Sequence, residues 1–254
     1  MEWVIHEAVT HLKEWRELEK SILSHHHKIK IYEMGQPMPD GDIVRCPVND
    51  AIKYNDHRGV MCDLESLNAA NCYNRFKELL KRSWMQISMS NFKSEAKKIM
   101  DIIGQEDSLF IKPSRFGKIG GAHIIGLNDV DHYVDKYSIA EDEIMIVSSP
   151  IRITKEYRVI MKDDKAVTAC QYKSRGSKGG MAIEKIDAKL ESSILEWCNN
   201  AVKKYPQTQT ARMYVLDIGI TQNNEWIVVE MNSFSSSGFY KCNVDEIVKS
   251  VSTL

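Results

Sequence analysis

The stretch YVLDIGITQNNEWIVVEMN, residues 214–232, decides the fold because two apolar runs flank a pair of turn-forming asparagines. Asn223 and Asn224 tolerate positive φ, so the stretch is expected to form a hairpin with a two-residue turn. Counting outward from that turn places Asp217 directly opposite Glu230. The hairpin therefore brings together two carboxylates from different strands.

Side chains alternate between the two faces of a strand, so this hairpin is expected to have one apolar face and one polar face. The apolar face would carry Leu216, Ile218, Ile220, Ile227, Val229 and Met231, and the other face Asp217, Gly219, Thr221, Trp226, Val228, Glu230 and Asn232. Opposed like charges destabilise a strand pair unless they share a proton or hold a cation. Two carboxylates and an amide oxygen suit Mg²⁺, so Asp217, Glu230 and Asn232 are candidate metal ligands. A solvent-facing hairpin without a ligand is the alternative.

The composition is that of an ordinary globular protein of 254 residues, with 43% hydrophobic and 27% charged residues. The net charge is −1 and no long basic block occurs, so binding to nucleic acid is not expected. The chain has no apolar run long enough to cross a membrane and no signal-peptide pattern near its start. Its six cysteines are scattered without a CxxC pair, which predicts free thiols in a reducing cytoplasm.

Helices and strands are expected to alternate along the chain, which indicates the α+β class. The spacing of apolar residues predicts helices over 3–24, 64–80, 92–103, 129–137 and 187–204. Strands are predicted at 28–32, 108–112 and 143–148, short strands and turns at 43–62, and a second hairpin at 154–172.

A basic, glycine-containing segment follows the strand that ends in Lys112. It contains Gly117, Lys118, Gly120 and Gly121. Glycines let backbone N–H groups approach a phosphate closely, and the lysines supply positive charge. The sequence GxxxxGK[ST] is absent, so this segment is not a Walker loop. An ordinary hairpin loop is the alternative.

The second hairpin, TKEYRVIMKDDKAVTACQYK at 154–173, is expected to turn at Asp163 and Asp164. Its mostly apolar face would carry Tyr157, Val159, Met161, Ala166, Thr168, Cys170 and Tyr172, and the opposite face Glu156, Arg158, Gln171 and Lys173. Arg158 and Lys173 suit phosphate oxygens, Arg through its planar fork and Lys as a point charge. A solvated charged face is the alternative.

Four segments together resemble the ATP-grasp superfamily: IKPSRFGKIGG (111–121), EIMIVSSP (143–150), KEYRVIM (155–161) and LDIG…WIVVEMN (216–232). The resemblance covers residues 84–254 and looks most like a compact clade common in bacteriophages and bacteria. It implies an ATP-grasp fold with ATP between two α+β subdomains and a hinge near 143–150. Residues 1–83 are left as an N-terminal α/β region that is a candidate for substrate binding.

The resemblance also implies roles for single residues. The nucleotide would contact Lys112, Lys118, Gly120, Gly121, Val147, Glu156 and Arg158, and Mg²⁺ would bind Asp217, Glu230 and Asn232. Lys112, Arg158 and Lys173 would be catalytic. Family members often carry a further lysine upstream of the Lys112 strand, for which Lys93, Lys97 and Lys98 are the candidates.

The implied activity is that of an ATP- and Mg²⁺-dependent ligase. The γ-phosphate would pass to the carboxylate of a small molecule or peptide, and an amine or thiol would attack the resulting acylphosphate. The alternatives are kinase-like transfer to a hydroxyl and a non-catalytic ATP-binding interaction protein. Retention of both Asp217 and Glu230 argues against the last, because an inactive site would have no need of their mutual repulsion. The expected location is the cytoplasm of a bacterium or an infected host cell.

Overall fold

The computed structural model describes residues 1–59, 64–115, 123–174, 183–206 and 212–254. The chain divides into two compact units, the first formed by 1–67 with 153–254 and the second by 68–152. This division does not coincide with the boundary expected after residue 83. The reason is a shared hydrophobic core: Trp3 and Ile43 of the N-terminal region pack in one cluster with Ile160 and Val215.

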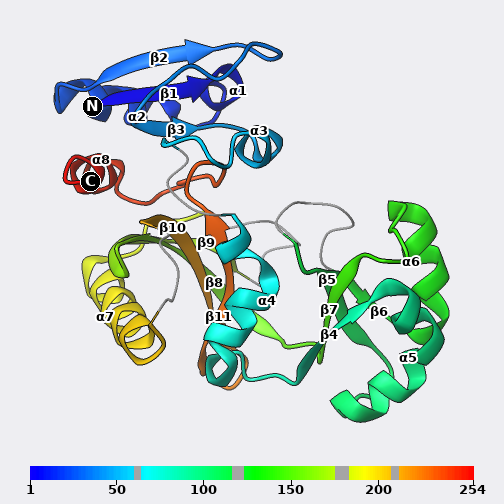
Figure 1. The fold of residues 1–254 in the computed structure, drawn as a ribbon. Coiled ribbons are helices and arrows are strands. Elements are labelled where there is room, and N and C mark those ends of the chain that lie inside the picture. The colour runs from blue at the N-terminus through cyan, green and yellow to red at the C-terminus, as the bar shows by residue number, and fades with distance from the viewer. Residues whose placement is uncertain (60–63, 116–122, 175–182, 207–211) are drawn as a thin grey trace. The chain divides into compact units, whose positions relative to one another are not determined.

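The first unit begins with a parallel three-stranded sheet in the order β2-β1-β3 (Figure 1). Its elements are β1 (Glu2–His6), α1 (Glu7–Thr10), α2 (Trp15–Ser24), β2 (Lys28–Tyr32), β3 (Ile43–Arg45) and α3 (Val48–Lys53). The helix predicted from residue 3 is wrong at its start, because residues 2–6 form a strand. Trp3, Val4 and Ile5 are all fully buried. A central strand of a parallel sheet is covered on both faces, so its apolar residues run consecutively.

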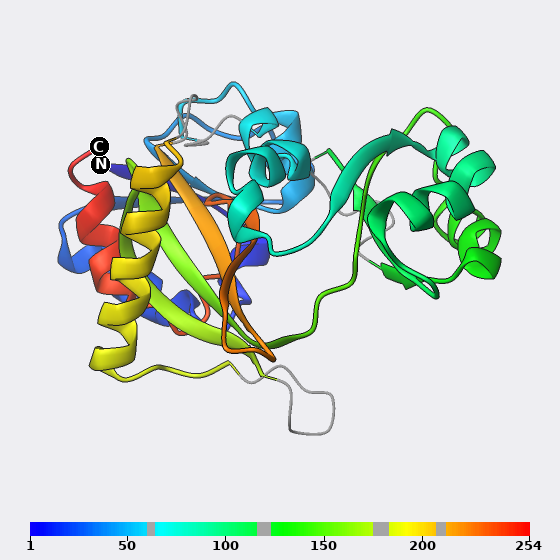
Figure 2. The same ribbon diagram turned by 90° about the horizontal axis from the view of Figure 1, so that it is seen from below.

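The first unit also holds an antiparallel sheet in the order β11-β10-β8-β9. Its elements are β8 (Ile153–Lys162), β9 (Lys165–Ser174), α7 (Ala188–Lys204), β10 (Met213–Thr221), β11 (Trp226–Ser233) and α8 (Val244–Val251), after a short 3₁₀ turn (Glu65–Leu67) that contacts β11. Helix α7 runs along one face of this sheet (Figure 2), and α8 packs against α2 and contacts β8 and β9.

The second unit is built on an antiparallel sheet in the order β4-β7-β5-β6. Its elements are α4 (Ala69–Arg75), a 3₁₀ turn (Lys77–Leu79), β4 (Trp84–Ser88), α5 (Met89–Ile103), β5 (Leu109–Pro113), β6 (His123–Ile125), a 3₁₀ turn (Leu127–Asp129), α6 (Val130–Tyr137) and β7 (Ile144–Ser148). Helix α5 begins at Ser88, whose Oγ accepts from Asn91 N, and ends at Gly104 in the left-handed conformation. The strand predicted as the hinge is β7, which lies inside this unit.

The two hairpins turn differently. Asp163 and Asp164 both have positive φ, 45° and 57°, as the two-residue turn predicted there requires. In the other hairpin only Asn224 has positive φ, and Thr221 N donates to Glu225 O at 2.9 Å. The predicted two-residue turn at Asn223 and Asn224 is therefore wrong, and the register beside it is shifted by one residue.

A β-bulge between Asp217 and Ile218 compensates for that shift and places Asp217 opposite Glu230, as predicted. Beyond the bulge, the predicted faces of β11 are exchanged. Trp226 lies on the α7 side, where its ring is 5.8 Å from Tyr157 and 5.9 Å from Trp197.

The strand β9 also departs from the predicted alternation, because two bulges interrupt its pairing with β8. Cys170 pairs with Arg158, and Gln171 pairs with Tyr157. Cys170 therefore shares the face of Arg158, opposite to the prediction, and Gln171 lies on the other face. The five described cysteines are free thiols, as predicted; Cys62 lies outside the described residues.

Candidate functional site

The site is centred on Asp217, which lies in the middle of the antiparallel sheet between Arg158 of β8 and Glu230 of β11. Its side chain is fully buried, with 0% exposure. Arg158 binds it with two prongs, Nε to Oδ1 at 3.0 Å and Nη2 to Oδ2 at 2.8 Å. A paired, hydrogen-bonded carboxylate is the form in which a buried charge is tolerated.

Asn232 joins the two carboxylates of the site. Its Nδ2 donates to Asp217 Oδ2 at 3.0 Å and to Glu230 Oε1 at 3.1 Å. The amide therefore offsets the repulsion between carboxylates that the register brings together. Glu230 and Asn232 are partly exposed, whereas Asp217 is not. The open side of the cluster is formed by Glu230 and Asn232.

The donor set has the chemistry of a magnesium site, since carboxylate and amide oxygens are the ligands of this hard cation. Glu230 and Asn232 fit such an ion directly. Asp217 fits it as a ligand only when Arg158 releases one of its oxygens, because both are occupied by the guanidinium. Among the described residues, no set of three His, Cys, Asp or Glu side chains forms a metal centre.

The protonation of the pair follows from burial and charge. Burial raises the pKa of Asp217, and the charge of Arg158 opposes that rise. Burial alone would lower the pKa of Arg158, but the charge and hydrogen bonds of Asp217 raise it above its ordinary value. We therefore treat the pair as a guanidinium and a carboxylate at neutral pH.

Two tyrosines enclose the guanidinium of Arg158. The rings of Tyr172 and Tyr240 stack 5.9 Å apart, and Arg158 Cζ lies 4.9 Å and 4.7 Å from their centroids. Arg158 Nη1 also donates to Gly238 O at 3.0 Å. The guanidinium is thus fixed by stacking and hydrogen bonds together. Tyr172 was predicted on the opposite face of β9, and the correction follows from the bulge.

Glu156 lies on the edge of the same cluster. Its Oε2 accepts the hydroxyl of Tyr172 at 2.6 Å. Burial, followed by the negative charge of Asp217, raises the pKa of Tyr172 well above its ordinary value, so the hydroxyl remains a neutral donor. Lys173 pairs with Glu156 in the β8–β9 ladder, while its side chain lies outside the described part.

The other predicted nucleotide contacts belong to the second unit. Lys112 lies opposite Ile146 on β5, with Nζ 5.6 Å from the centroid of Tyr73. Val147 is fully buried in the core of this unit, so only its backbone remains for a ligand contact. Lys118, Gly120 and Gly121 lie outside the described residues.

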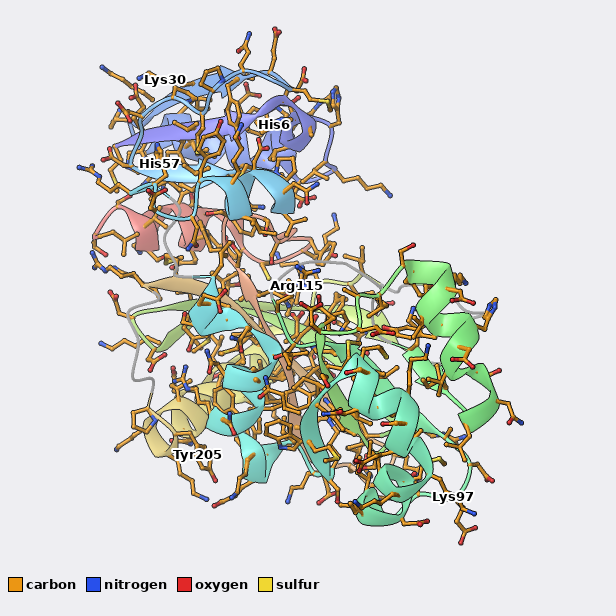
Figure 3. All side chains as sticks on the ribbon, turned by 45° about the vertical axis from the view of Figure 1, so that its right-hand side comes forward. His6, Lys30, His57, Lys97, Arg115 and Tyr205 are labelled. Carbon is orange, nitrogen blue, oxygen red and sulfur yellow. The ribbon has the colours of Figure 1, made fainter. Side chains whose placement is uncertain are left out.

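The three lysines considered upstream of β5 all lie exposed on α5. Lys93 pairs with Asp131 at 3.4 Å, and Lys98 pairs with Glu95 at 3.2 Å. Lys97 extends away from the helix into solvent (Figure 3).

Comparisons with known proteins agree with this architecture. The model of an ATP-grasp domain family, described as family 2 of its clade, matches residues 92–250. The crystal structure of the D-cycloserine synthetase DcsG superimposes with a TM-score of 0.66 at 8% identity, covering 98% of this chain and 99% of that one. VanG D-Ala:D-Ser ligase from Enterococcus faecalis gives 0.62 at 12% identity, covering 100% and 98%. The ATP-grasp ligase PsnB complexed with minimal precursor, Mg and ADP gives 0.58 at 12% identity, covering 99% and 96%.

Fold and family match together define an ATP-grasp protein of the α+β class, as predicted. Within that superfamily the chain belongs to the ATP-grasp domain family whose model it matches. The similarity in fold includes residues 1–83, where the sequence showed no resemblance. A search of curated protein sequences finds no significant match. No helix in the described part of the chain is long and apolar enough to cross a membrane.

Proposed function

We propose that the protein is an ATP- and Mg²⁺-dependent ligase that activates a carboxylate as an acylphosphate and joins it to an amine or thiol. The observation that supports this most is the cluster of Asp217, Arg158, Asn232 and Glu230 in a chain of the ATP-grasp superfamily. Fold alone does not define a reaction, so the proposal depends on this cluster. The ligases among the structural neighbours are consistent with it.

Each residue has a role under this proposal. Glu230 and Asn232 hold Mg²⁺, with Asp217 behind them; the bound ion would supply neutralisation of phosphate charge. Lys112, Lys118 and the backbone of Gly120 and Gly121 bind phosphate oxygens. The nucleotide also contacts the backbone of Val147 and the side chain of Glu156. Arg158 and Lys173, with Lys112, orient and neutralise the transferred phosphoryl group.

A non-catalytic ATP-binding protein remains the alternative of a different class. Repulsion between Asp217 and Glu230 was the argument against it. That repulsion is offset by Arg158 and by the amide of Asn232. Keeping both carboxylates therefore costs little, and turnover has to separate the two classes.

The test is ATP turnover against pooled amino acids, small carboxylates and short peptides, with ADP plus phosphate and AMP plus pyrophosphate measured separately. Hydroxylamine is added as a nucleophile that converts an acylphosphate into a stable hydroxamate. A ligase gives ADP, phosphate and a carboxylate-dependent hydroxamate. ADP with a phosphorylated product and no free phosphate indicates a kinase. Tight ATP binding without turnover across the pools indicates a binding protein.

A further inference from the structure

A second buried arginine lies beside the cluster and comes from the N-terminal sheet. Arg45 is the last residue of β3 and is 2% exposed. Its Nη1 donates to Phe234 O and its Nη2 to Ser237 O. Its Cζ lies 3.8 Å from the ring centroid of Phe239. Its Nε has no hydrogen-bond partner among the described residues. Arg45 thus uses its charge on backbone carbonyls.

The carbonyls that Arg45 binds belong to residues 233–239, which we call the serine loop. This loop follows Asn232 directly. The N-terminal region holds it at two further points, Cys46 N donating to Ser235 O at 2.9 Å and Phe239 N donating to Glu14 Oε1 at 3.1 Å. The loop backbone is therefore fixed mainly by residues distant in sequence.

Arg45 and Arg158 bind consecutive carbonyls of the serine loop. Arg45 binds Ser237 O, and Arg158 binds Gly238 O while it pairs with Asp217. A displacement of the loop at Ser237 therefore moves the acceptor of Arg158. The contact chain from Arg45 to Asp217 contains only hydrogen bonds and one peptide unit.

Stability is a poor reason for placing an arginine here. Burial lowers the pKa of Arg45 to about 10, which reflects the cost of removing its charge from water, although the charge of Glu14 partly offsets this. A buried charge is often replaced by apolar residues without loss of stability, so its value lies more readily in geometry.

We infer that Arg45 is a positioning residue of the proposed magnesium site, because it fixes the serine loop that holds Arg158 and follows Asn232. It acts through the loop, and it lies outside residues 92–250, which match the family. The inference rests on the proposed function, since it concerns the same metal ion. Residues that orient metal ligands from behind commonly change metal affinity by about 10–100-fold.

The test uses the full chain with Arg45→Lys, which keeps the charge but loses the fork, and Arg45→Met. Ile247→Val is the control, because Ile247 lies in the same hydrophobic core without a polar contact to the loop. Calorimetry measures ADP binding over a Mg²⁺ titration. Both Arg45 variants should need about tenfold more Mg²⁺ for half-maximal binding. ADP binding without Mg²⁺ should be unchanged. Hydrogen exchange of amides 234–238 without ligand should quicken in both.

The outcomes separate the two proposals. A wild-type protein with no Mg²⁺-dependent ADP binding overturns the proposed function and the role of Arg45 with it. A wild-type dependence that Arg45→Lys retains in full overturns only the role of Arg45. An equal shift in Ile247→Val assigns the effect to general destabilisation and also overturns it. If Arg45→Met fails to fold, Arg45→Lys decides.

Discussion

Arg158 and Asp217 face each other across the β8–β10 ladder and form a two-pronged ion pair at 3.0 Å and 2.8 Å in the core of the sheet. The carboxylate expected to bind metal is therefore already neutralised by the arginine expected to bind phosphate. Charge on a bound ligand would act on both members of the pair. This relationship makes the cluster one electrostatic unit and determines how its variants should behave.

Arg158→Met should destabilise the ligand-free protein by about 3–5 kcal/mol, because it leaves the buried carboxylate of Asp217 without its partner. Urea unfolding measures the loss. Arg212→Met is the matched control: Arg212 pairs with Asp163 and binds the carbonyl of Leu254, but it is about half exposed. That variant should lose less than about 1 kcal/mol. Equal losses in the two variants would contradict the buried ion pair.

Glu230→Gln should weaken Mg²⁺-dependent ATP binding by about tenfold or more, since a lost charged contact is worth about 1.5 kcal/mol or more. Glu225→Gln should not, because Glu225 lies exposed beside the hairpin turn. Calorimetry with and without Mg²⁺ separates the metal contribution from nucleotide binding alone. If both variants bind ATP equally, Glu230 is not a metal ligand.

The opposition of Asp217 and Glu230 could be predicted from the sequence, because alternation and a turn define which residues face each other. The prediction had the right pair through two compensating features, a longer turn at Asn224 and a bulge after Asp217. A bulge changes the pairing without a clear local signal, which is why the face of Trp226 was predicted wrongly.

Other features depend on contacts between distant segments. The strand β1 was predicted as helix because Trp3, Val4 and Ile5 continue into a helical spacing, and only burial by β2 and β3 makes them a strand. The stacking of Tyr240 on Tyr172 likewise joins residues 68 positions apart in the chain. Neither periodicity nor a local motif contains that information.

Lys112→Ala should weaken ATP binding while leaving the melting temperature of the ligand-free protein near that of the wild type. Its contact with Tyr73, a cation–π contact at 5.6 Å, is worth about 0.5–1 kcal/mol. Lys136→Ala is the control, since Lys136 Nζ lies 5.2 Å from the ring of Tyr137 in the same unit. A large drop in melting temperature for Lys112→Ala alone would assign Lys112 a structural role instead.

Gly219→Ala should cost about 1–3 kcal/mol, because an added methyl group overpacks the sheet two residues from Asp217. Its Cβ would lie 2.8 Å from Ile153 Cγ2 and 3.3 Å from Val229 Cγ2. The nearest atom to a Cβ at Gly126 is the end of the Asp129 side chain at 3.3 Å, so Gly126→Ala should be milder. Thermal unfolding compares the two variants. A neutral Gly219→Ala would contradict the packing of the bulged hairpin.

His27 should make stability fall as the pH falls below about 6.5. The ring is 9% exposed; Nδ1 accepts from Trp3 Nε1 at 3.1 Å, and Nε2 lies 3.1 Å from Ser252 Oγ. Burial, followed by the charge of the N-terminal amine, lowers the pKa of His27.

The sign of the effect follows from proton binding. Between the lowered pKa in the folded state and the ordinary value of about 6.5, the unfolded chain binds more protons, so acid favours unfolding. His27→Gln keeps an acceptor and a donor but cannot titrate. Urea unfolding between about pH 7.5 and about pH 5.5 should therefore show a shallower loss of stability in His27→Gln than in the wild type. His25→Gln is the control, because His25 is largely exposed at its contact with Asp245. Identical slopes for His27→Gln and the wild type would show that the ring of His27 is not held neutral by Trp3 and its burial.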